Sequence, residues 1–201
     1  MKKLLALILS LLLAFGCLAC DAQNTPIPQN PTPAPSYHDS PEDIAKEFMR
    51  ALAYLDMDAL VDCLPEYNVN FMLASARQTG LEADENLTDR QALAQLLKDE
   101  LSEERDSAVT EATFTATKID EDNYPGDLMA ELYEVVEEEG APEGIDPTLL
   151  DQVDEVAWVE IAGTVTYEDG TTEEDTITVP CVKIDDKWYV DMFSMLFLAA
   201  F

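Results

Sequence analysis

The spacing of apolar residues changes near Ser107, and this change restricts the folds open to the chain more than any other feature. Between residues 40 and 104, apolar residues recur every three or four positions, as on one face of a helix. From Ser107 onward, threonine and valine are frequent and apolar residues alternate with polar ones, as in half-buried strands. The sequence therefore predicts an α+β fold, with N-terminal helices packed on a curved antiparallel sheet.

Local signals place the helices of the first half. Ser40 precedes Pro41 and Asp43, a combination of N-cap, first-position proline and first-turn acid that predicts a helix start. Thr88 and Gln91 form a capping-box pair before a run of leucines and alanines. Two shorter helices are predicted between these starts, in 56–66 and 68–80.

The second half predicts a strand, a helical insertion and three further strands. The first strand is expected in 107–119, the acidic helix in 127–140, and the last three strands within 156–193. Turns are predicted at Asp169-Gly170 and at Asp185-Asp186. Alternation places Trp158 on one face of its strand and the following residues on the other: Val159, Ile161, Val165 and Tyr167.

The N-terminus predicts export. Lys2 and Lys3 precede an uncharged run from residue 4 to 20, which is typical of a secretory signal and rather short for a membrane span. Small residues stand directly before Cys17 and before Cys20, as in a bacterial lipobox. We favour Cys20 as the lipidated residue because the chain becomes polar directly after it, and Cys17 is the alternative.

The remaining chain divides into a tether and one domain. Residues 1–20 are the expected lipoprotein signal peptide, 21–39 a proline-rich disordered tether, and 40–201 a single α+β domain. The apolar C-terminal tail, 192–201, is expected to pack on the domain or to dock on a partner.

The charge is strongly negative, with 11 Lys and Arg against 42 Asp and Glu and a formal net charge of -31. Such a chain would repel the phosphates of nucleic acid, so we expect no nucleic-acid partner. It would also repel anionic headgroups, which makes an N-terminal lipid the expected means of membrane attachment.

No catalytic group stands out. His38 is the only histidine and falls in the predicted tether, so no serine–histidine pair is expected within the domain. The acids in or beside strands are weak candidates for a general base, because side chains there usually face solvent or cap turns: Asp154, Glu160 and Asp191. The tyrosines Tyr54, Tyr133 and Tyr189 are expected in the core. We expect no catalytic residue, cofactor or metal.

Two further cysteines, Cys63 and Cys181, fall at apolar positions. Export permits a disulfide between them, but free cysteine is among the most buried residue types, so the sequence leaves both states open.

Two segments carry a resemblance to a known family. SPEDIAKEFMRALAYLDMDALVDCL (40–64) and VKIDDKWYVDM (182–192) resemble exported bacterial lipoproteins of unknown function with the nuclear-transport-factor-two-like, or cystatin-like, fold. The resemblance implies a sheet wrapped around the first long helix as a half-open cone. It covers 40–66 and 155–192, whereas 67–150 is longer and more helical than the usual pattern.

The expected function is a lipid-anchored, extracytoplasmic binding module without enzymatic activity. Its partner would be an envelope protein or a small apolar ligand held on the concave sheet face, on residues such as Val159 and Ile161. Two alternatives remain open: a cone-fold enzyme of isomerase or cyclase type with a buried carboxylate as general base, and a structural envelope spacer.

Overall fold

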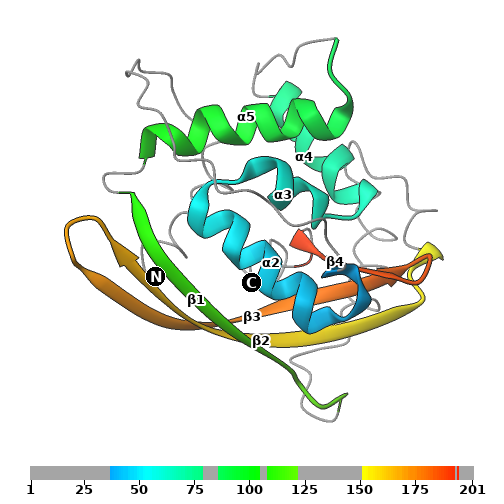
Figure 1. The fold of residues 1–201 in the computed structure, drawn as a ribbon. Helices are drawn as coiled ribbons and strands as arrows, with labels where there is room; N and C mark the ends of the chain where they lie inside the picture. The colour runs from blue at the N-terminus through cyan, green and yellow to red at the C-terminus, as the bar shows by residue number, and fades with distance from the viewer. Residues whose placement is uncertain (1–36, 79–85, 105–107, 122–150, 193, 195–201) are drawn as a thin grey trace.

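The structure, a computed structural model, describes residues 37–78, 86–104, 108–121, 151–192 and 194. It is an α+β fold in which the helices precede a curled, four-stranded antiparallel sheet with strand order β1-β2-β3-β4 (Figure 1). The elements are η2 (Tyr37–Asp39), α2 (Pro41–Tyr54), α3 (Met57–Asp62), α4 (Glu66–Gln78), α5 (Asp89–Glu104), β1 (Val109–Lys118), β2 (Glu155–Tyr167), β3 (Thr172–Ile184) and β4 (Lys187–Val190).

The predicted helix starts are confirmed. The Ser40 hydroxyl accepts a hydrogen bond from the backbone N–H of Asp43 at 3.1 Å, and Pro41 begins α2. Thr88 and Gln91 exchange the reciprocal bonds of a capping box at the start of α5, with donor–acceptor distances of 3.1 and 3.4 Å. The two shorter helices are α3 and α4, and the end predicted for the second of them, at Gly80, lies outside the described residues.

The strands and their turns are also confirmed. Gly170, in the turn between β2 and β3, has a φ of 80°, and the turn between β3 and β4 places Asp185 and Asp186 at φ values of 50° and 61°. Asp185 and Asp186 are the two central residues of the β3–β4 turn. Left-handed geometry at both of them matches the twist of a tight two-residue hairpin. At the edge of the sheet, the Ala112 N–H of β1 donates to the hydroxyl of Tyr54 at 3.0 Å, which ties β1 to the end of α2.

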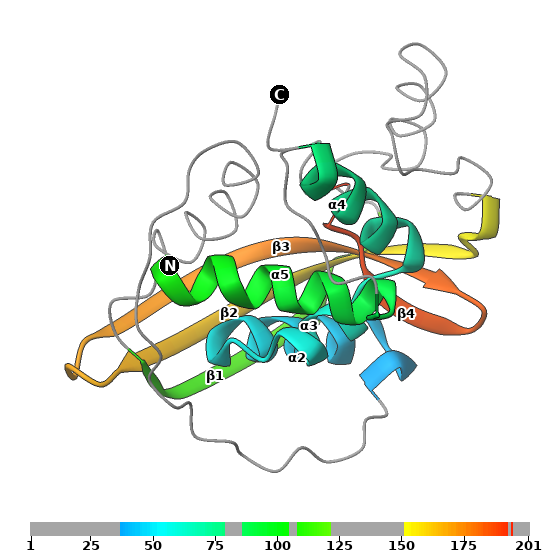
Figure 2. The ribbon, with the colours of Figure 1, turned by 90° about the horizontal axis from the view of Figure 1, so that it is seen from above.

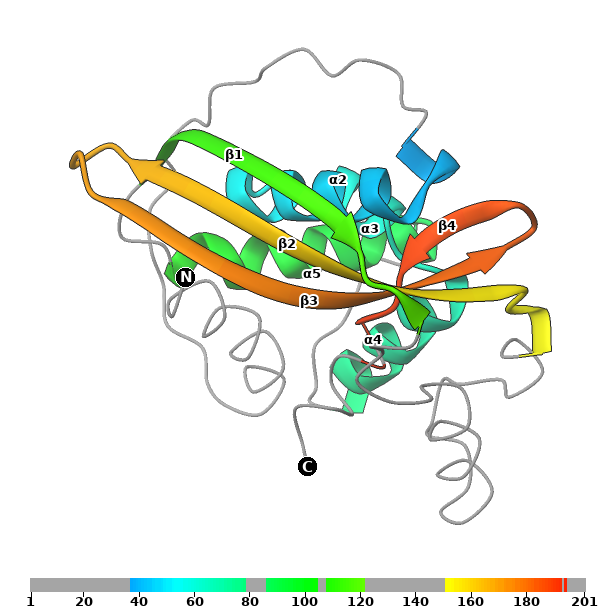
Figure 3. The same ribbon diagram turned by 90° about the horizontal axis from the view of Figure 1, so that it is seen from below.

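The helices that the structure describes lie on one side of the sheet. Helix α2 packs directly against the strands, and α3 and α5 lie beyond it (Figure 1). Seen from above, α5 crosses over the strands while α4 lies toward the end of the sheet that carries β4 (Figure 2). Seen from below, no described helix covers β1, β2 and β3 (Figure 3). The sheet therefore has an inner face under the helices and an outer face.

One apolar core joins the inner face to the helices. It includes Phe48 of α2, at 1% exposure, and Trp188 of β4, at 6%. Val159, Ile161 and Val165 of β2 are buried on the inner face, as predicted, while Tyr167 is half-buried. Because these three side chains pack beneath helix, they do not line an open pocket.

Several predictions concern other parts of the chain. The signal peptide, Cys17 and Cys20, the tether up to residue 36, the acidic helix in 127–140 and most of the tail lie outside the described residues. In the part of the chain that the structure describes, no helix is long and apolar enough to span a membrane.

Candidate functional site

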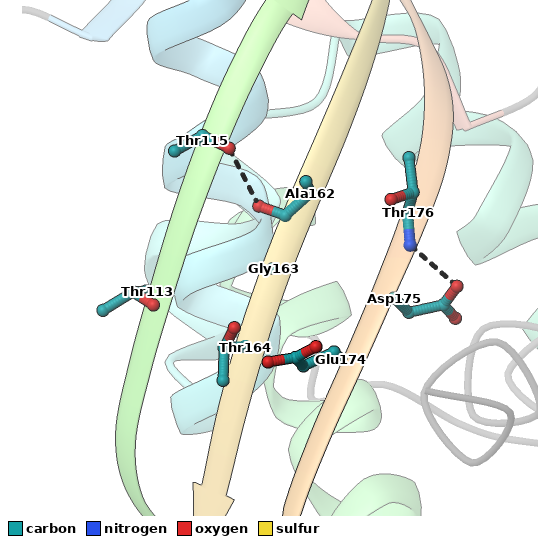
Figure 4. Close-up of a pocket in the computed structure, with 8 residues that line it drawn as sticks. All are labelled: Thr113, Thr115, Ala162, Gly163, Thr164, Glu174, Asp175 and Thr176. Atoms are coloured by element: carbon teal, nitrogen blue, oxygen red, sulfur yellow. Dashed lines mark hydrogen bonds between the residues drawn. The ribbon is translucent and has the colours of Figure 1, made fainter.

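The outer face of the sheet carries a hollow of about 600 Å³ at the middle of β1, β2 and β3. Its lining comes from alternate, outward-facing positions of the strands and from the backbone between them (Figure 4). The lining residues are Thr113, Thr115, Ala162, Gly163, Thr164, Glu174, Asp175 and Thr176.

The hollow exists because a small residue stands between larger ones. The register places Ala162 of β2 directly between Thr115 of β1 and Thr176 of β3. The alanine methyl group forms a low floor, and the two threonines rise on either side. In the next row, Glu174 reaches from β3 toward Thr164 of β2 (Figure 4). The rim therefore offers hydroxyl groups and a carboxylate.

The hydrogen bonds at the rim join residues of the sheet to one another and leave the hollow open. The Thr115 hydroxyl donates to the carbonyl oxygen of Ala162 at 3.3 Å, and the backbone N–H of Thr176 donates to the Asp175 carboxylate at 2.7 Å (Figure 4). The Thr115 bond fixes its side chain across the β1–β2 pair. Such a site can hold a polar or cationic group by hydrogen bonds and charge, without chemistry on the ligand.

A second polar group is buried on the helix side, around Asp191. This residue follows β4 and is 0% exposed. Its carboxylate accepts hydrogen bonds from the Asn68 amide at 2.9 Å, from the Ser194 N–H at 3.4 Å and from the Ser194 hydroxyl. The hydroxyl of Tyr67, also buried, makes no hydrogen bond of normal geometry. It nevertheless interacts electrostatically with the carboxylate of Asp191.

Burial dominates the electrostatics of this cluster. Loss of water raises the pKa of Asp191, while the hydrogen bonds from Asn68 and Ser194 lower it by a smaller amount. Burial first, and then the charge of Asp191, raise the pKa of Tyr67 well above its ordinary value. A raised carboxylate pKa is a feature of some general bases.

The geometry of Asp191 nonetheless fits a structural role. Its side chain bonds the N–H of Ser194, the third residue after it, and helical geometry is present at 192 and 194. This is the bonding of an N-cap. The sequence predicted that Asp154, Glu160 and Asp191 would face solvent or cap turns. Asp154 and Glu160 are exposed to solvent, and Asp191 caps the turn that follows it.

The structure places His38 differently from the sequence prediction. His38 lies in η2 rather than in a free tether, and its Nδ1 is 2.6 Å from the carbonyl oxygen of Trp188. Its ring also lies against that of Tyr189, with centroids 4.9 Å apart. The segment Tyr37–Asp39 therefore contacts β4.

The remaining candidates are accounted for singly. Cys63 and Cys181 are buried and free, with no disulfide between them. Burial raises the pKa of both thiols, so neither is poised as a thiolate. Tyr133 lies outside the described residues. Within the described segments, no three His, Cys, Asp or Glu side chains are grouped so as to hold a metal ion.

Sequence reasoning missed the hollow. A usable signal was present, because threonine recurs at every second position in TFTAT (113–117), TVT (164–166) and TIT (176–178). Such spacing predicts a polar sheet face. The depression itself depends on which residues stand beside Ala162 after the strands pair.

Comparison with known proteins adds no assignment. The chain matches no protein-family model, no curated protein sequence and no solved structure.

Proposed function

We propose that this chain is a lipid-anchored, extracytoplasmic binding module of the bacterial cell membrane, and that it binds its partner on the outer face of the sheet without catalysing a reaction. The observation that supports this best is the hollow over Ala162, which opens to solvent among exposed hydroxyls and carboxylates. The inner face offers no comparable opening at Val159, Ile161 and Val165, since all three are buried.

The anchoring half of the proposal depends on the N-terminal sequence. Cys20, or alternatively Cys17, carries the lipid, and the proline-rich chain after it separates the domain from the membrane. The fastening of η2 to β4 supports this arrangement, because the tether then meets a fixed point on the domain.

A photo-crosslinking experiment tests the binding half. A photoreactive amino acid replaces Thr115, at the edge of the hollow, in the full-length chain expressed in bacteria. A matched variant carries it at Asp58, an exposed position on α3. We expect a discrete crosslinked species from position 115 and none from position 58.

Other outcomes separate the alternatives. Equal yields of crosslinked species from both positions, or none from either, would contradict a binding surface at the hollow. A module that binds nothing on any face would instead fit a structural spacer.

A general-base enzyme is the second candidate, and the burial of Asp191 with its raised pKa favours it. Against it, the carboxylate has no exposed surface and is already occupied by Asn68 and Ser194. Turnover of a ketone or ester substrate that disappears in Asp191→Asn, with the fold retained, would favour the enzyme over the binding module.

A further inference from the structure

Part of the outer face has a restricted composition. In the four rows where outward positions of β1, β2 and β3 all pair, only threonine, glutamate and alanine are present. The rows are Thr117–Glu160–Thr178, Thr115–Ala162–Thr176, Thr113–Thr164–Glu174 and Glu111–Thr166–Thr172. Toward the β4 end, the outward positions of β2 and β3 continue with Trp158 opposite Pro180, and both are buried.

The charge on this face has one sign. Glu111, Glu160 and Glu174 are exposed, and the rows contain no lysine or arginine. The ion pairs among the described residues involve other acids, such as Glu47, Glu66 and Glu155. The face therefore offers carboxylates with no basic neighbour in the rows, on a chain whose formal net charge is -31. This combination attracts a cationic partner and repels an acidic one.

The hollow suits a long basic side chain. A lysine or arginine has an apolar stem and a charged tip, and it buries the stem while the tip reaches a polar rim. The methyl group of Ala162 and the neighbouring threonines offer a surface for the stem, and Glu174 offers a carboxylate for the tip.

The spacing of the acids suits an extended partner. Neighbouring rows lie about 6.6 Å apart, because a strand rises about 3.3 Å per residue. Glu160 and Glu174 lie in rows on either side of the Ala162 row, so they are separated by about 13 Å along the strands. An extended peptide repeats its own side chains at the same intervals, with alternate residues on one face.

From these observations we infer that the outer sheet face is a docking surface for an extended basic segment of a partner protein, with lysine or arginine on alternate positions. The inference rests on the proposed function and names the chemistry of its partner. A second copy of the chain is disfavoured as the occupant, because two such faces would repel each other. A sugar polymer is disfavoured because the four exposed rows contain no aromatic residue and Trp158, which continues this face toward β4, is only 2% exposed.

Two synthetic peptides test the inference by fluorescence anisotropy with the purified full-length chain in neutral detergent. One alternates lysine with threonine, and the other has the same composition with its lysines together. At low salt, where charges are little screened, we expect the alternating peptide to bind at least about fivefold more tightly. Equal affinity for the two peptides would show attraction to net charge alone and overturn the inference.

Variants locate the binding. The double substitution Glu160→Gln and Glu174→Gln should lower the affinity for the alternating peptide by about fivefold to tenfold, as expected for the loss of two exposed ion pairs. The control pair Asp58→Asn and Asp62→Asn removes the same charge from two exposed positions on the far helix α3 and should change affinity less than about twofold. An equal loss of affinity in the two double variants would overturn the inference.

Ala162→Leu tests the hollow without changing charge. Ala162 is exposed, so the larger side chain should raise the floor of the hollow between Thr115 and Thr176 and leave the thermal melting temperature unchanged. We expect weaker peptide binding, and unchanged binding would contradict a role for the hollow. If no basic peptide binds while a protein still crosslinks at Thr115, the basic partner is wrong and the proposed function stands. If no basic peptide binds and no protein crosslinks at Thr115, both the basic partner and the proposed binding module are wrong.

Discussion

Asp191 and Glu160 are both acids in or beside strands, yet they reach opposite environments. Glu160 occupies an outward position of β2 and is exposed, whereas Asp191 is 0% exposed and accepts hydrogen bonds from Asn68 and Ser194. Sequence alone could not distinguish them, because the amide that holds Asp191 lies 123 positions away in the chain. The difference arises only when α4 packs against the end of β4.

The buried state of Asp191 predicts an unusual dependence of stability on pH. Burial raises its folded-state pKa above the ordinary value of 3.8, so the folded chain holds a proton that the unfolded chain releases. The contribution of Asp191 to the free energy of unfolding is therefore fully present when the pH is below 3.8, and it is lost as the pH rises through the folded-state pKa. The asparagine side chain of Asp191→Asn is neutral at every pH. The stability of this variant relative to the parent should therefore increase as the pH rises through this window.

Denaturant unfolding of both proteins from about pH 4 to about pH 8 measures this difference. Asp58→Asn is the control for the loss of a carboxylate, because Asp58 is exposed. A relative stability of Asp191→Asn that stays constant, or falls, as pH rises would contradict the assignment of a desolvated carboxyl.

Gly163 gives a second prediction at the residue scale. A Cβ at this position would lie 2.5 Å from Cδ1 of Phe114, the residue opposite it in β1. Because Phe114 packs against the core, Gly163→Ala should lower the free energy of unfolding by about 1 to 3 kcal/mol through overpacking. Thermal and denaturant unfolding measure the loss.

A double-mutant cycle isolates the cause. Phe114→Leu should recover part of the loss in Gly163→Ala, since the ring is the atom group in the way. It should not rescue Gly170→Ala, where nothing lies within 4 Å and the strain comes from a φ of 80°. Simple additivity of the Gly163 and Phe114 changes would mean that the ring does not restrict position 163.

At the scale of elements, the sequence predicted most of the fold because the signals were local. Ser40 and Thr88 mark helix starts within one turn, and alternation marks each strand. The end of α2 was less predictable. The residue that caps its C-terminus, Leu55, takes a left-handed φ of 55°, a conformation that glycine usually supplies. Tertiary packing overrides the local preference there, since Leu55 lies against the core.

The contact between α2 and β4 gives a prediction at this scale. Phe48 and Trp188 belong to the same buried cluster, so truncation of either to alanine leaves a large cavity. Each change should lower the free energy of unfolding by about 3 to 5 kcal/mol. Leu87→Ala, at a position 37% exposed, is the matched control and should cost well under about 1 kcal/mol. Melting temperatures of the Phe48 and Trp188 variants within a degree or two of the parent would contradict this packing.

At the scale of the whole molecule, the structure shows where the proposed tether would meet the domain. Residues 37–39 lie beside β4 at one end of the sheet, and the turn between β2 and β3 lies at the other end (Figure 3). If Cys20 is acylated, as we propose, a proline-rich linker of this length could hold the domain up to about 50 Å from the membrane and would meet it at the β4 end. Such a distance would leave the proposed binding face accessible to a partner protein.

This arrangement requires a lipid on the N-terminal cysteine, which gives the last prediction. Changing both Cys17 and Cys20 to serine should abolish incorporation of radiolabelled palmitate and partitioning into the detergent phase, because a single membrane attachment is then lost. Loss of label from Cys20→Ser alone would assign the site, whereas loss from Cys17→Ser alone would assign the alternative. Cys63→Ser is the control for thiol loss, since Cys63 is buried in the core, and it should keep its label. Label that survives the double change would contradict the lipoprotein proposal.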